Sequence, residues 1–214
     1  ITGYQKFGSY TGSGSAGNAQ NVGFKPDFLM FRRYNNSDNW VIVDTRRTED
    51  KYLLADTTGT EQSLDILDFT STGWTFKGSS MNNSSDNYIY WAVAKNVPSN
   101  TTLANSFKTV TYTGTGSSQA ITGLGFRPDL VWIKQRGGTT WHNIQDTING
   151  ATKHLYTNAN NALDTTSDGL TSFDSDGFTL GGGNGFNGSS QSMVAWAWKA
   201  GNTWQSNIDG TIPS

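Results

Sequence analysis

The sequence predicts an all-β fold of two tandem antiparallel β-sandwiches of the jelly-roll or lectin-like kind, and two observations lead to this prediction. First, the 214-residue chain repeats itself, so that Tyr10 returns as Tyr112 and Trp91 as Trp196, at offsets of 102 and 105 residues. Second, short apolar or alternating runs recur between turn-forming clusters of Gly, Asn and Ser, a pattern typical of sandwiches and barrels. Because self-similarity at a fixed period indicates a reused folding unit, we expect one sandwich per repeat.

Four motifs carry the repeat. In chain order they are YTG at 10–12 and 112–114, GFKPD at 23–27 with GFRPD at 125–129, FTSTGW at 69–74 with FDSDGF at 173–178, and IYWA at 89–92 with VAWA at 194–197. The repeat also supplies an internal control. Features that both copies keep are expected to serve the fold, and features of one copy alone are free to serve function.

The expected strands follow from the short apolar runs. These are residues 27–31, 40–43, 88–93, 130–133 and 193–198. Turns are expected at 34–39 and 137–138, and the glycine-rich stretch 181–185 is expected to be a flexible hairpin. The chain is poor in the residues that favour helices, and 60–67 and 159–163 are its two short helix-like stretches.

The repeated residues have mechanical explanations. Pro26 and Pro128 fix φ and lack a donor, which suits the first residue of a strand. Gly73 and Gly177 each precede an aromatic that opens a strand, where a turn would favour positive φ. The runs containing the repeated Trp are expected to form the central strand of each core. The core positions expected to be equivalent are Trp91 with Trp196, Phe28 with Leu130, and Trp74 with Phe178.

The repeat also sets the expected domain limits. We predict a first sandwich over 1–97, a linker over 98–105, a second sandwich over 106–201 and a C-terminal connector over 202–214. The linker is polar and contains Pro98, and the repeat ends after Gly201. Each unit has about one hundred residues, a size at which a single core can form.

Composition argues against several classes of protein. The net charge is -2 with 15 Lys plus Arg against 17 Asp plus Glu, and no basic run marks a nucleic-acid surface. No apolar run approaches the roughly 18 residues of a membrane helix, so no membrane insertion is expected. The absence of Cys excludes disulfides, a thiol nucleophile and a thiolate metal site.

The sequence does not favour an enzyme. His142 and His154 stand 12 residues apart without a metal-ligand motif, so both are expected to be surface or loop residues. Glycosidases need two carboxylates across a cleft, and two of the 17 acidic residues are Glu. Asp174 and Asp176 are weak candidates for catalytic acids or Ca²⁺ ligands, although such a pattern before a strand commonly forms a turn. We therefore expect no catalytic residues, no cofactor and no bound metal.

Recognition remains as the expected role. Sugar binding uses exposed aromatic faces together with polar side chains on loops of a rigid sheet. The loops after the two Pro-led strands differ between copies, and Trp40 aligns with Trp141. Their residues form the candidate binding set: Arg33, Tyr34, Asn36, Asp38 and Trp40 in copy one, and Arg136, Trp141 and His142 in copy two. The two arginines are expected to be exposed. The alternative is that both tryptophans are core residues.

The repeated motifs carry a resemblance. The stretches 112–114, 123–134, 170–180 and 194–201 resemble a β-sandwich domain repeated in tail and other structural proteins of bacteriophages, many of them marine. Each unit is also distantly similar to the H-type lectin sandwich. The resemblance implies a virion-associated, extracellular module that contacts other virion chains, with a homotrimer among the possible assemblies. It brings no catalytic residues and identifies no ligand.

Three functions are therefore weighed. The first is a non-catalytic tail-fibre-type module that binds a host-surface carbohydrate as its receptor. The second is a structural spacer or decoration domain without a small ligand. The third is a polysaccharide depolymerase, which the lack of paired Glu residues disfavours.

Overall fold

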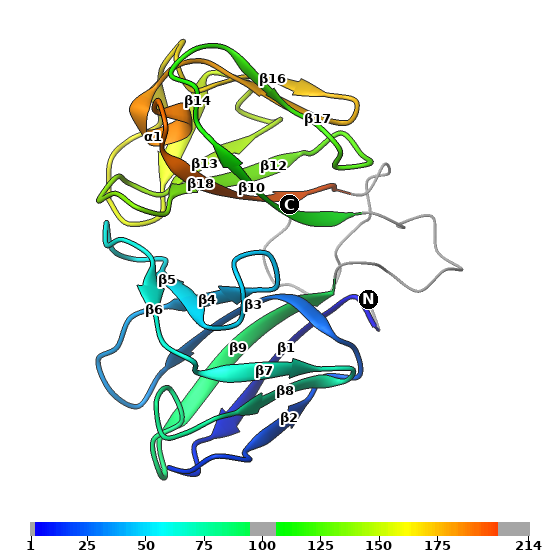
Figure 1. Ribbon diagram of the computed structural model, residues 1–214, viewed down its shortest axis with the longest axis vertical. Coiled ribbons are helices and arrows are strands. Elements are labelled where there is room, and N and C mark those ends of the chain that lie inside the picture. Colours follow the sequence, from blue (N-terminus) through cyan, green and yellow to red (C-terminus); the bar gives the residue numbers. More distant parts are fainter. Residues whose placement is uncertain (1–2, 95–105, 201–214) are drawn as a thin grey trace, which may run out of the picture.

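The computed structural model describes residues 3–94 and 106–200 and contains two similar antiparallel β-sandwiches, one per repeat (Figure 1). The predicted fold class is therefore confirmed, and within these two described ranges no sheet mixes strands of the two repeats. The predicted linker over 98–105 and connector over 202–214 lie outside the described residues, so these limits stay predictions.

The first sandwich pairs a six-stranded sheet with a three-stranded sheet. The larger sheet has the order β1 (Gln5–Thr11), β9 (Asn87–Ala94), β3 (Pro26–Arg33), β4 (Val41–Asp44), β5 (Lys51–Leu54) and β6 (Gln62–Ser63). The smaller sheet has the order β2 (Ala19–Asn21), β8 (Gly73–Phe76) and β7 (Leu67–Thr70).

The second sandwich has the same strand order. Its larger sheet runs β10 (Phe107–Thr113), β18 (Ser192–Trp198), β12 (Leu130–Gln135), β13 (Asn143–Asp146), β14 (Lys153–Tyr156) and β15 (Asp164–Thr165). Its smaller sheet runs β11 (Gln119–Ile121), β17 (Gly177–Leu180) and β16 (Leu170–Asp174). The repeat in the sequence is therefore a repeat of topology.

The registers show which positions correspond. Phe7 pairs with Trp91 as Thr109 pairs with Trp196, and Phe28 pairs with Asp44 as Leu130 pairs with Asp146. The predicted equivalences of Trp91 with Trp196, Phe28 with Leu130, and Trp74 with Phe178 are confirmed as register positions. Burial differs within two of them, because Phe28 and Trp196 are fully buried while Leu130 and Trp91 are half-buried.

Local sequence explains the strand starts. The Pro-led strand β3 begins at Pro26, whereas β12 begins two residues after Pro128. Gly73 and Gly177 open β8 and β17 directly after turns at 71–72 and 175–176, and the predicted positive φ is found at Gly177 (158°) but not at Gly73. A close approach of the neighbouring strand requires glycine at both positions. A Cβ at either glycine would collide with the carbonyl oxygen of the neighbouring strand, at Gln20 or Ile121.

The expected helix-like and hairpin segments differ from the prediction. Residues 60–67 contain β6 and the first residue of β7, and residues 159–163 are irregular. The glycine-rich stretch 181–185 leads into the short helix α1 (Asn184–Asn187) rather than forming a flexible hairpin. Phe186 of this helix is buried in the second sandwich, so apolar packing orders the segment.

Each sandwich has its own core, formed by alternate residues of its strands. In β3, Leu29 and Phe31 face the small sheet of the first sandwich. They belong to one core cluster with Trp74 of the small sheet and Tyr88 of β9. The second sandwich has a corresponding core around Phe178 and Met193. Because side chains alternate across a strand, the remaining residues of β3 face the opposite side of the large sheet.

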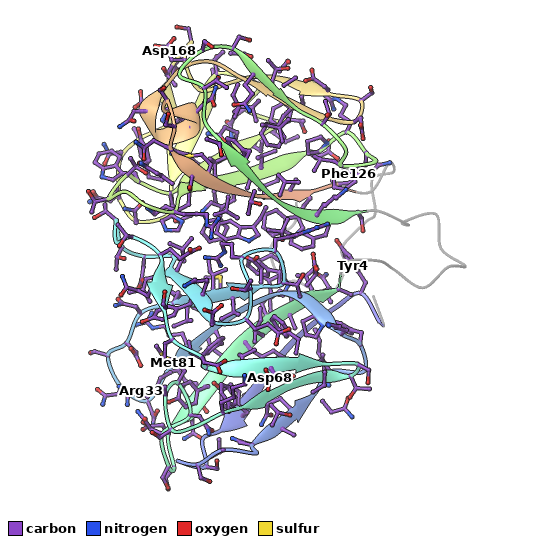
Figure 2. The ribbon with its side chains drawn as sticks, viewed as in Figure 1. Tyr4, Arg33, Asp68, Met81, Phe126 and Asp168 are labelled. Carbon is purple, nitrogen blue, oxygen red and sulfur yellow. The ribbon has the colours of Figure 1, made fainter. Side chains whose placement is uncertain are left out.

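That opposite side forms a third core, shared by both repeats. The two large sheets pack face to face, so the molecule is a stack of four sheets (Figure 1). Side chains from both halves fill the layer between the large sheets, with Tyr4 at its edge (Figure 2). The buried members are Tyr4, Phe28, Ile42, Leu53, Ala55 and Val93 of repeat one and Phe107, Trp132, Val194 and Trp196 of repeat two.

Polar contacts also join the two halves. The Trp196 indole donates to the buried Asp44 carboxylate over 3.0 Å, and Arg47 lies over the same indole at 5.3 Å. Arg136 forms two hydrogen bonds of 2.9 Å with Glu61 of the other repeat. One face of each large sheet, the inner face, thus packs on the small sheet of its own sandwich. The opposite, outer face packs largely on the other repeat.

Candidate functional site

The interface leaves one large groove open beside it. This aromatic groove has a volume of about 630 Å³ and lies over the outer face of the first large sheet. It is lined by Phe7, Gly8, Met30, Trp40, Ala55, Asp56, Ile89, Tyr90 and Trp91 of repeat one and by Trp132 and Thr157 of repeat two. The lining is mostly aromatic and aliphatic, so the groove suits a ligand with an apolar face.

Strand register positions the aromatic floor. Phe7 of β1 pairs with Trp91 of β9, and Trp91 pairs with Met30 of β3, so the three side chains form a row across the outer face. The Phe7 and Trp91 rings stack with centroids 5.6 Å apart and planes at 6°. Phe7 is 68% exposed, so the fold leaves most of this large apolar side chain in contact with solvent.

The polar groups of the groove lie at its wall. Asp56 follows β5, and its Oδ1 accepts a hydrogen bond of 3.2 Å from the backbone N–H of Trp40. Thr157 comes from repeat two and donates to the carbonyl of Ala55 over 2.8 Å. Both repeats therefore build the wall, and the groove depends on their docking.

The same surface of repeat two is closed. Five residues that line the groove have register equivalents in repeat two, and all five equivalents are buried. In the order Phe7, Trp91, Met30, Ile89 and Trp40, the equivalents are Thr109, Trp196, Trp132, Val194 and His142. The two large sheets thus pack with an offset that covers this face in one repeat and leaves part of it open in the other. Among the described residues, the groove of repeat one therefore has no counterpart on this face of repeat two.

The predicted loop of copy one is held by its own contacts. Arg33 pairs with Asp86 over 2.6 Å and with Asp38 over 3.2 Å, and its side chain is 17% exposed. The expectation of an exposed arginine is therefore wrong here. Arg33 holds the pKa of Asp86 below its usual range through this hydrogen bond. Tyr34 and Asn36 are exposed at the tip of the loop.

Of the copy-one set, Trp40 lines the aromatic groove and the others do not. Arg33 lies in the lower half of the view, away from the inter-repeat layer (Figure 2). The structure therefore separates Trp40 from Arg33, Tyr34, Asn36 and Asp38, although all five come from one stretch of sequence.

The predicted residues of copy two also separate. Arg136 is 25% exposed and bound to Glu61, so it serves the inter-repeat contact and is not the exposed arginine that the sequence suggested. Trp141 is 41% exposed and meets Tyr156 edge to face at 4.4 Å. Its role in binding stays a prediction.

His142 is a buried interface residue. Its side chain is fully buried, and its Nδ1 accepts a hydrogen bond of 3.0 Å from the Trp132 indole. Register also corrects the alignment of the two loops, because Trp40 corresponds to His142 and not to Trp141. Burial, aided by the nearby charges of Lys134 and Arg47, lowers the pKa of His142 to about 3.

This burial predicts a pH-dependent stability. Unfolded His142, with an ordinary pKa near 6.5, takes up a proton below pH 6.5 while the folded form stays neutral. The free energy of unfolding should therefore fall as the pH drops, by about 2 kcal/mol from this residue between pH 7.5 and 5. Urea denaturation at both pH values would measure the loss.

The matched variant for this test is His142→Asn, whose amide oxygen can still accept from the Trp132 indole. Its loss of stability between pH 7.5 and 5 should be smaller than that of the wild type by about 2 kcal/mol. An unchanged pH dependence would contradict the buried neutral state.

His154 is buried as well, so the expectation of two surface histidines is wrong. Its Nε2 lies 2.8 Å from the Tyr156 hydroxyl, which in turn donates to Asp164 over 3.0 Å. Burial lowers the pKa of His154, and Asp164 partly opposes this effect. Burial also raises the pKa of Tyr156 to about 12, so the phenol is not a nucleophile near neutral pH.

Asp174 and Asp176 have local structural roles. Asp176 accepts backbone N–H groups of Gly125 and Gly123 over 2.6 and 2.9 Å, which lowers its pKa. Asp174 accepts the hydroxyls of Ser172 and Thr179 over 2.8 and 2.7 Å. Within the described residues no group of three or more His, Cys, Asp or Glu side chains could hold a metal ion. The described part of the chain also has no helix that could cross a membrane.

Sequence reasoning missed most of the groove. Phe7, Met30, Asp56, Ile89 and Trp91 were not in the predicted set, although all of them line it. One signal was present, because the runs at 27–31 and 88–93 are apolar at consecutive positions and so supply apolar side chains to both faces of the sheet.

The chain belongs to a family described as a domain of unknown function, DUF7483, whose model matches residues 1–97 and 103–214, the two repeats. No curated protein and no solved structure matches the chain. The family supports the repeat and leaves the activity open, so the groove has to be interpreted from its chemistry.

Proposed function

We propose that this chain is a non-catalytic module of a virion protein of the tail-fibre type, and that it binds a carbohydrate on the host surface in the aromatic groove. The virion context, and with it an extracellular location and contacts with other virion chains, rests on the likeness of the repeated motifs to phage structural domains. The carbohydrate rests on the groove itself.

The observation that carries the proposal is the open row of aromatic side chains. Phe7, Trp40 and Trp91 line the groove together with the Asp56 carboxylate. Aromatic rings can stack on the apolar face of a sugar, and by analogy with aromatic pairs each contributes on the order of 1 kcal/mol. A carboxylate can accept hydrogen bonds from sugar hydroxyls.

The chemistry of the groove favours binding over hydrolysis. Glycoside hydrolysis uses a pair of carboxylates on either side of the scissile bond. Among the described residues that line the groove, Asp56 is the one carboxylate. A depolymerase therefore stays the less favoured candidate.

A structural spacer is the second candidate, and one observation favours it. The core shared by the two large sheets joins the repeats into one stack, which would suit a rigid connector. Direct binding of the chain to host cells or to a glycan array separates the two candidates, since a spacer should bind neither.

We predict that Trp40→Ala lowers binding to host cells or to the responding glycan about fivefold, the equivalent of about 1 kcal/mol. Phe7→Ala should give a similar loss with an unchanged melting temperature, because that ring is 68% exposed. Quantitative cell binding or isothermal titration would measure both.

Trp141→Ala is the matched control, since Trp141 is exposed outside the groove. It should bind like the wild type. If Trp141→Ala lost binding while Phe7→Ala and Trp40→Ala kept it, the site would lie at the copy-two loop and the groove would be the wrong choice.

A further inference from the structure

Among the residues that the structure describes, Arg32 is a cation without an anionic partner. Among the described arginines that are not fully exposed, Arg33, Arg47 and Arg136 each pair with a carboxylate, whereas Arg32 has no such pair. The Arg32 Nε is buried and has no hydrogen-bond partner among the described residues. Leaving a half-buried guanidinium unpaired costs free energy, which a bound anion would recover.

Arg32 is not itself a lining residue of the aromatic groove, but its neighbours place its charge at the edge of the groove. Arg32 pairs with Ile89 across β3 and β9, and Ile89 and Trp40 both line the groove. The guanidinium carbon lies 5.9 Å from the centroid of the Trp40 ring. A cation over an indole is held by the ring, and its outward N–H groups can still bind a ligand.

Repeat two shows what the same position does when it serves the fold. Register equates Arg32 with Lys134, which is fully buried. The Lys134 ammonium donates to the carbonyls of Gln135 and Gly138 over 2.8 and 2.9 Å. The cation of repeat two is thus satisfied by hydrogen bonds within the fold, whereas the described residues give that of repeat one the Trp40 ring and no ion pair.

We infer that the groove takes a sugar that carries a carboxylate, and that Arg32 recognises this group. A guanidinium presents a planar fork of N–H donors that matches a carboxylate in a two-bond geometry. The apolar face of the sugar then stacks on the aromatic row, while Asp56 accepts its hydroxyls and repels the carboxylate from that wall. The inference rests on the proposed carbohydrate function and adds its ligand class, a hexuronate or a related sugar acid.

The test compares two probes by isothermal titration: an oligoglucuronate and an oligoglucose of the same length and linkage. The wild-type chain should bind the oligoglucuronate at least tenfold more tightly, and this preference should shrink as salt is raised. Arg32→Gln should remove the preference and keep the weaker binding of the neutral sugar. Arg32→Lys should keep part of it, because Lys retains the charge and lacks the fork.

Arg46→Gln is the matched control, since Arg46 is an exposed arginine and the described residues show no contact of its side chain with a residue of the groove lining. It should leave the preference unchanged, and the melting temperature of each variant checks the fold. Equal binding of both probes by the wild type, or an unchanged preference in Arg32→Gln, overturns the inference while the carbohydrate function stands. Binding of neither probe, in a chain that also binds no glycan on an array, overturns both.

Discussion

Replacing Asp44 by Ala is expected to lower the free energy of unfolding by about 3–5 kcal/mol, because it removes the nearer of the two carboxylates that pair with the buried Arg47 and leaves the Glu61 carboxylate at 3.5 Å. Asp44 is fully buried and accepts hydrogen bonds from Arg47 Nε over 2.7 Å and from the Trp196 indole over 3.0 Å. It also accepts two backbone N–H groups, of Arg46 and Arg47. Urea denaturation at neutral pH would measure the loss.

Asp146→Ala is the matched control, since Asp146 is the register equivalent of Asp44 in repeat two. Its carboxylate binds its own turn at Ile148 and Asn149 and is partly exposed, so its loss should be about 1 kcal/mol. Adding Arg47→Met to Asp44→Ala should recover much of the stability by removing a buried charge that has lost its nearer carboxylate. A loss for Asp44→Ala no larger than that for Asp146→Ala would contradict this account of the interface.

Trp196→Ala should cost about 3–5 kcal/mol, the usual range for removing a large buried ring. The Trp196 ring meets Phe28 of the other repeat at 6.0 Å and Trp132 of its own at 5.4 Å. Because this ring is part of the core that both repeats share, its loss should weaken the docking of the two sandwiches. Calorimetry of the wild type should show one transition, and the variant should unfold at a lower temperature.

Trp91→Ala provides the comparison, since it changes the equivalent position on the half-open face. Trp91 is half-buried and lines the groove, so its loss should cost about 1–2 kcal/mol in proportion to the smaller buried area. The same substitution should weaken sugar binding, whereas Trp196→Ala acts on stability. Equal losses of stability for the two variants would mean that the offset between the sheets is not as described.

Of the site residues predicted from the sequence, one lines the groove that forms the candidate site. Trp40 lines the groove as a site residue, whereas Arg136 and His142 are interface residues and Arg33 binds acids of its own repeat. Sequence spacing placed Trp40, Arg136 and His142 on loops correctly, whereas Arg33 is the last residue of β3. A residue at such a strand end or loop can turn toward solvent, toward a neighbouring strand or toward another domain. Spacing alone contains no information about which of these three it meets.

The sequence by itself determined the two sandwiches and the equivalent core positions, because period-two alternation and turn residues act locally and occur twice. It also supplied apolar side chains on both faces of β3, with Phe28 and Met30 alternating with Leu29 and Phe31. Only the tertiary structure decided what the second face meets. The two large sheets pack on each other with an offset, since burying both faces removes more apolar surface from water than leaving them exposed. That offset encloses His142 and Trp196 and leaves Phe7, Trp40 and Trp91 along an open groove.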